Sequence, residues 1–130
     1  MKFSIGILQM AGRLADHASA RQTVIANNLA NADTPGFKAR DIASFADTYT
    51  ASDRMFAPRP PRPGHIPFND TGGYESFESS AFGAEDPNGN TVSLEDQMVR
   101  SADIRMEHDL ALGIYGKSLD ILRAGMGRIR

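Results

Sequence analysis

SIGILQMAGRLADHASARQTVIANNLANADTPG, residues 4–36, is the stretch that decides the fold. Small and apolar residues recur in it at alternating steps of 3 and 4, the spacing of a heptad seam on one helix face. The helix must end before Pro35, because the residue that precedes a proline is pushed away from helical geometry. The spacing therefore predicts a helix over residues 4–32, followed by a type II turn at Pro35-Gly36. The seam runs through Leu8, Ala11, Ala15, Ala18, Gln22, Ile25, Leu29 and Ala32.

A second long helix is predicted over residues 93–128. Ser93 and Asp96 resemble a capping box, with Asp in place of the usual Glu or Gln. Apolar residues again follow at steps of 4 and 3, and this seam is firm from Leu112 onward. It is weak between Ser101 and His108, where a neighbouring apolar stripe offers the helix a second side to bury. We expect the packing seam of the two helices to contain Leu8, Ile25, Leu94, Met98, Leu112, Leu119 and Leu122.

The middle of the chain, residues 33–92, differs in kind because it holds all seven prolines. We expect it to be irregular and partly disordered. Residues 57–67, APRPPRPGHIP, predict exposed polyproline II or disordered chain. Residues 42–50 fit either a short helix or an extended segment, and residues 70–92 predict loop, with room for a weak hairpin.

The fold class that follows is mainly α. Two long terminal helices form an antiparallel coiled-coil hairpin, joined by a Pro/Gly-rich irregular segment, in a single domain over residues 1–130. A two-helix hairpin has a thin core and leaves apolar surface on its outer faces. Such surface usually marks an interaction site. The pattern favours an assembly or adaptor protein over a self-contained enzyme.

Composition excludes several classes of function. The net charge of −2 argues against a nucleic-acid partner, because phosphate binding needs a basic face. Without cysteine there is no thiolate nucleophile and no Cys-ligated metal. The three histidines match no metal-binding spacing, and no serine elbow or phosphate loop is present. We expect no catalytic residue, no metal, no cofactor and no small-molecule substrate. The N-terminus also lacks a Sec signal peptide pattern.

Two segments carry a family resemblance. Residues 26–42, ANNLANADTPGFKARDI, resemble the end of the N-terminal helix in flagellar axial proteins, and within them the FlgB family of proximal rod subunits. Residues 89–106, GNTVSLEDQMVRSADIRM, are similar to that family's entry into its last helix. Where the family usually has Asn, this chain has Asp103, and His108-Asp109 replaces an aromatic-Gln pair.

The resemblance implies a non-enzymatic structural subunit of the flagellar basal body. Such a subunit leaves the cytoplasm through the flagellar type III export apparatus without a cleaved signal peptide. Its expected partners are itself, other rod proteins, the inner-membrane ring and the export apparatus. It would link that ring to the more distal rod across the periplasm and transmit torque.

The resemblance also implies an assembly motif at the end of the first helix. Its residues are Asn27, Asn28, Leu29, Asn31, Asp33, Thr34, Pro35, Gly36, Phe37, Lys38 and Arg40. Two alternatives stay open. One is another axial subunit, such as one of the FlgC type, and the other is a cytosolic coiled-coil adaptor or export chaperone.

Overall fold

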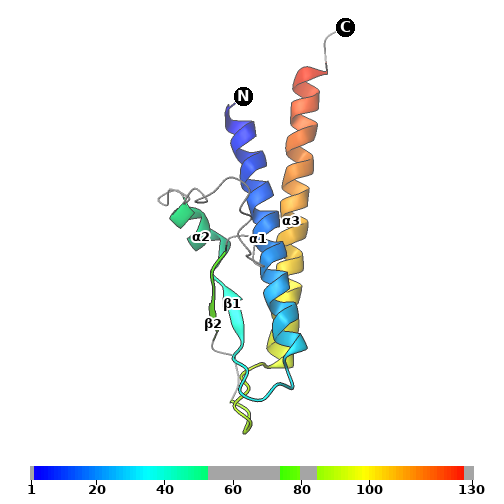
Figure 1. The fold of residues 1–130 in the computed structure, drawn as a ribbon. Coiled ribbons are helices and arrows are strands. Elements are labelled where there is room, and N and C mark those ends of the chain that lie inside the picture. The colour runs from blue at the N-terminus through cyan, green and yellow to red at the C-terminus, as the bar shows by residue number, and fades with distance from the viewer. Residues whose placement is uncertain (1, 53–73, 80–84, 128–130) are drawn as a thin grey trace, which may run out of the picture.

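Two long helices dominate the computed structural model, which describes residues 2–52, 74–79 and 85–127, with side chains in the first range described for 6–49. Helix α1 spans Lys2–Ala30 and helix α3 spans Leu94–Met126. They run antiparallel along each other for most of their length (Figure 1). The prediction of a mainly helical chain with two packed terminal helices is confirmed.

The seam between α1 and α3 repeats at heptad spacing and contains three alanines and a serine, together with two isoleucines and a glutamine. On α1 the buried positions are Ala11, Ala18 and Ile25. On α3 they are Gln97, Ile104, Ala111 and Ser118, again seven residues apart. A seven-residue repeat keeps one stripe of each helix facing its partner.

Local capping explains where α3 begins. The side chain of Ser93 accepts a hydrogen bond from the backbone N–H of Asp96, which satisfies one of the free donors of the first turn. Glu95 and Asp96 place negative charge at the positive end of the helix dipole. The cap predicted at Ser93 is therefore present.

The middle of the chain packs on the side of α1 that α3 leaves free. Strand β1, Arg40–Ile42, is followed by the short helix α2, Phe45–Ser52, which settles the alternative left open for this region. Strand β2, Ser76–Glu78, pairs antiparallel with β1, with Asp41 opposite Phe77. Ile42 packs with Ala20 and Val24 of α1 in a second small core.

Two predictions concern the structure of residues 33–92. The first is the weak hairpin within residues 70–92. Within the described residues, the strand pair of the middle segment joins β2 to β1, and residues 70–73 and 80–84 lie outside those residues. The antiparallel partner is supplied from about 35 residues earlier in the chain, a pairing that no local turn signal announces. The polyproline II prediction for residues 57–67 lies outside the described residues.

Candidate assembly site

Asn28 joins the end of α1 to both the loop that follows and to α3. Its side chain is buried, and its amide pairs with both backbone groups of Arg40: Nδ2 donates to the carbonyl at 2.7 Å and Oδ1 accepts from the N–H at 3.0 Å. Nδ2 also donates to Oε1 of buried Gln97 at 3.0 Å. The side-chain amide thus pairs with the backbone of β1 as a neighbouring β-strand would, and it also links α1 to α3.

The turn that follows α1 is held by Asn90, a residue that sequence reasoning missed. Its Nδ2 lies 2.8–2.9 Å from the carbonyl oxygens of Asn31, Ala32 and Thr34. Carbonyls at a helix C-terminus have no partner within the helix. The chain just beyond such an end needs partners as well, and one buried amide from 56–59 residues downstream supplies them to three carbonyls of the turn after α1. The Asn-Gly dipeptide signal at residues 88–89 located the turn but not this neighbouring side chain.

Two glycines with positive φ shape the turn after α1. Gly36 has φ +73° and follows Pro35, and the N–H of Phe37 donates to the carbonyl of Thr34 at 3.2 Å. These features match the predicted type II turn. Gly89, with φ +82°, approaches so closely that an added Cβ would lie 3.4 Å from the Cα of Gly36. The two turns are thus packed against each other through glycine backbones.

Asp41 is the centre of an ion cluster that joins three elements. It accepts two hydrogen bonds from Arg21 of α1, both 2.8 Å, and one from Arg100 of α3 at 2.5 Å. Burial alone raises the pKa of Asp41, but bonds from Arg21, the N–H of Ile42 and Arg100 outweigh it and lower that pKa below its ordinary value. Arg100 also pairs with Asp96.

The other charged residues of the motif have partners within the chain as well. Lys38 forms an ion pair with Glu85, and Arg40 donates from its side chain to the backbone carbonyl of Ser76. The sequence suggested these charges for contacts at a subunit boundary. In the isolated chain they hold the middle segment against the end of α1.

The residues of the assembly motif differ in how far they are exposed to solvent. Asn28 is its buried member, and Asn31, Phe37 and Lys38 are half-buried. Asn31 bonds to Asn27 and Thr34 along the helix end. The members that remain exposed are Asn27, Leu29, Asp33, Thr34, Pro35, Gly36 and Arg40. Their contacts with neighbouring subunits stay a prediction.

The predicted packing seam is offset from the seam that α3 uses toward α1. Ile25 is buried in the interface, while Leu8, Leu119 and Leu122 are half-buried. Leu94, Met98 and Leu112 are more than half exposed. Met98 and Leu112 lie one residue after the buried Gln97 and Ala111, so they point about 100° away from the interface. Their packing against other chains stays a prediction.

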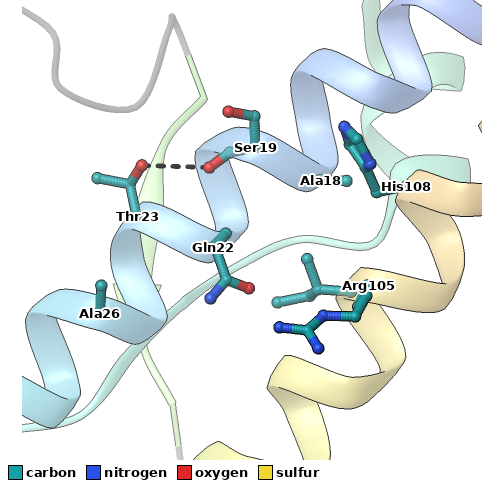
Figure 2. Close-up of a pocket in the computed structure, with 8 residues that line it drawn as sticks. Ala18, Ser19, Gln22, Thr23, Ala26, Arg105 and His108 are labelled. Carbon is teal, nitrogen blue, oxygen red and sulfur yellow. Dashed lines mark hydrogen bonds between the residues drawn. The ribbon is translucent and has the colours of Figure 1, made fainter.

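Two apolar flanks of α3 remain uncovered by the residues that the structure describes. The first, which we call the groove flank, consists of Leu94, Met98, Arg105 and Leu112. Met98 and Arg105 of this flank line an open groove between α1 and α3, part of which is shown in Figure 2. Leu94 and Leu112 lie on the same side of α3 by helical spacing. The second, on the opposite side of the helix, we call the far flank, and it consists of Val99, Asp103, Met106, Leu110 and Ile121.

His17 fills a structural role. It is fully buried in α1, where its Nε2 lies 2.8 Å from the carbonyl of Ala43 and so carries the proton. The ring packs edge-on against Phe45 and Tyr74. Across residues 2–52, 74–79 and 85–127, no three His, Cys, Asp or Glu side chains gather as a metal site. In the same residues, no helix is long and apolar enough to cross a membrane.

Known proteins share sequence similarity with this chain. Residues 11–38, which hold the α1 seam and most of the motif, match the family model described as flagella basal body rod protein. The chain is 28% identical over 115 residues to the flagellar basal body rod protein FlgB of Agrobacterium fabrum (strain C58), covering 82% of this chain and 81% of that protein. It is 29% identical over 108 residues to FlgB of Bacillus subtilis (strain 168), covering 83% of each. The chain is therefore similar to flagellar basal-body rod proteins over more than four fifths of its length.

Proposed function

We propose that this chain is a structural component of the flagellum, and that neighbouring subunits pack against its helices and bury their exposed apolar surface. It is a structural subunit of the flagellar basal-body rod. We assign it no catalytic role. Its mechanism is mechanical, because close-packed side chains have low compressibility and suit a stiff shaft.

The observation that carries this proposal is the apolar surface of α3. Eight of its large apolar residues have more than half of their surface exposed in the single chain: Leu94, Met98, Val99, Met106, Leu110, Leu112, Ile121 and Met126. A helix that is apolar on several faces is normally buried on several faces. Covering one such side chain contributes about 1 kcal/mol or more. Neighbouring subunits would supply that cover.

We place the subunit at the ring end of the rod, next to the inner-membrane ring. The support is the resemblance of residues 26–42 to proximal rod subunits and the similarity to two proteins named FlgB. At this position the chain would contact other rod proteins, copies of itself, the ring and the export apparatus. It would pass torque from the ring to the distal rod.

Deletion of the gene tests the role, with electron microscopy of purified basal bodies and a plasmid-borne copy as control. We expect rings without rod or hook in the deletion strain, and complete structures when the plasmid restores the gene. Labelling of the plasmid-borne protein then checks its position at the ring end. Normal rods and hooks in the deletion strain would refute the structural role.

Fractionation separates this proposal from that of an export chaperone. A rod subunit co-purifies with basal bodies after the flagellum is complete, whereas a chaperone stays in the cytosolic fraction. Recovery of the protein in the cytosol alone would contradict the proposal.

A further inference from the structure

We propose that neighbouring copies of this chain pack side by side, parallel and nearly in register, with the far flank of one α3 against the groove of the next copy. This inference rests on the proposed function and specifies how the subunit meets itself. The contact joins two different surfaces, so each copy offers one surface to each of two neighbours.

The groove has the shape and charge of a docking surface. It is an open hollow of about 540 Å³ between α1 and α3, and a second hollow of about 410 Å³ continues it toward the end of α1. Gln22 and Arg105 point toward each other across it, and His108 lies beside Ala18 (Figure 2). In the first hollow the α1 wall is made of small and polar side chains, which leaves room for another helix, and Ile25 and Leu29 add apolar surface to the second. No acidic residue lines either hollow.

The far flank has the complementary character. Val99, Met106, Leu110 and Ile121 are exposed apolar side chains between 57% and 68% accessible. Asp103 lies among them and is exposed. Neither Asp103 nor Arg105 of the groove flank forms an ion pair within the described part of the chain. One flank therefore offers an exposed carboxylate, which interacts with Arg21 only through longer-range electrostatics, and the other offers an exposed guanidinium.

The levels of these residues along α3 fit a parallel arrangement with little axial offset. Arg105 and Asp103 are two residues apart, which is about 3 Å along the helix axis. The apolar members match in the same way, since Met98 lies level with Val99, and Leu112 lies within two residues of Leu110. Parallel copies with a small axial offset bring all three pairs within a few residues of each other. An antiparallel arrangement would bring the same set level, with Met98 near Leu110 and Leu112 near Val99. We choose the parallel one because copies that repeat one contact around a common axis in a helical array all run in the same direction.

Charge also argues against a two-fold contact through the groove. A two-fold axis near the centre of this surface would place Arg105 opposite Arg105, and like charges in an interface are unfavourable. A contact between different surfaces avoids this repulsion. Contacts of this type do not close on themselves unless the rotation forms a ring, so they can extend into a helical array.

Disulfide cross-linking tests the arrangement in assembled rods. The chain contains no cysteine, so introduced cysteines have no background. A chain carrying both Leu110→Cys and Leu112→Cys presents the two thiols on different sides of α3, about 160° apart. After mild oxidation of basal bodies from swimming cells, we expect a ladder of covalent multimers from this double variant. Each single variant should give none.

Three outcomes would overturn the inference while leaving the structural role intact. Dimers from one single-cysteine variant would indicate a two-fold contact. Cross-links to a different rod protein would mean that another subunit occupies the groove. Basal bodies that contain the double variant, support swimming and give no ladder would place these flanks elsewhere. Absence of the protein from basal bodies would instead count against the proposed function.

A charge swap gives a second test that does not depend on thiol geometry. In the double-cysteine chain, Arg105→Asp or Asp103→Arg alone should lower the ladder at least about tenfold, because each creates a like-charge contact. The combined swap should restore the ladder, since each interface regains one charge of each sign. The two positions are two residues apart on one helix and do not face each other, so rescue cannot arise within a chain. Loss without rescue, with unfolding curves unchanged, would refute the pairing.

Discussion

Asn28 provides a sharp test of how the motif works inside the chain. Its side chain makes three hydrogen bonds, two with the backbone of Arg40 and one with the side chain of Gln97. Asn28 is 1% exposed and Gln97 is 2% exposed, so water cannot replace the lost partners without opening the structure. Asn28→Ala therefore leaves buried polar groups unpaired at the junction of α1, β1 and α3.

The expected cost follows from those three bonds. At about 1 kcal/mol for each net hydrogen bond, the free energy of unfolding should fall by about 3 kcal/mol. A typical domain has only about 5–15 kcal/mol in total. The change should therefore be visible as a large decrease in the urea midpoint, with little change in slope.

Asn27→Ala is the matched control, because Asn27 is the same residue type one position earlier. Its side chain is exposed and accepts one bond, from Asn31 of the same helix end. Its loss should cost less than about 0.5 kcal/mol. Urea unfolding followed by circular dichroism at the helix band compares the two variants. Equal losses in both, or no loss in Asn28→Ala, would show that the network does not stabilise the chain.

Three further predictions concern other parts of the fold. The pKa of Asp41 is lowered in the folded chain, so this carboxylate stabilises the fold fully above its ordinary pKa of about 3.9. That stabilisation is lost as the pH falls through the folded pKa. Asp41→Asn should therefore flatten the loss of unfolding free energy that denaturant curves show between pH 4 and pH 2. Gly36→Ala should destabilise by about 1–2 kcal/mol, because φ is +73° there, whereas Gly113→Ala on the open surface of α3 should stabilise by about 1 kcal/mol, as calorimetry would show. Leu112→Asp should leave the melting curve of the single chain nearly unchanged, since this residue is 52% exposed, but should abolish swimming on soft agar; normal swimming would refute its burial in the assembly.

The long helices were predictable because their signals are local. Heptad spacing, the Ser93 cap and the Pro35-Gly36 turn are all read within a few residues, and the structure contains each of them. Residues that act across the chain were not predictable in this way. Asn90 holds the turn after α1 from 56–59 residues away, and His17 bonds to Ala43 from 26 residues away. Composition and periodicity carry no information about such pairs.

The offset of the α3 seam has a more specific cause. Reading a helix by its bulkiest stripe assumes that large apolar residues face the nearest partner. On α3 that stripe, with Met98 and Leu112, lies beside the interface, and the interface itself is formed by Gln97, Ile104, Ala111 and Ser118. Small residues on α3 permit close approach to Ala11 and Ala18, and they therefore lie in the interface between the two helices. The assumption that the bulkiest stripe faces the nearest helix fails where a helix packs against more than one other helix.

This distribution divides the stabilising free energy between the chain and its assembly. The inner seam buries two large apolar side chains, Ile25 and Ile104, each worth about 1.5–3 kcal/mol, and otherwise alanine and polar groups. The flanks of α3 hold more large apolar side chains than this seam does, all of them more than half exposed. Polar contacts at Asn28, Asp41 and Asn90 therefore define the hairpin's geometry, while most of the hydrophobic stabilisation available to α3 is gained when neighbours cover it. We expect the unfolding free energy of a single chain to be small and that of the assembled rod to be much larger, which amide hydrogen exchange along α3 in the two states would measure.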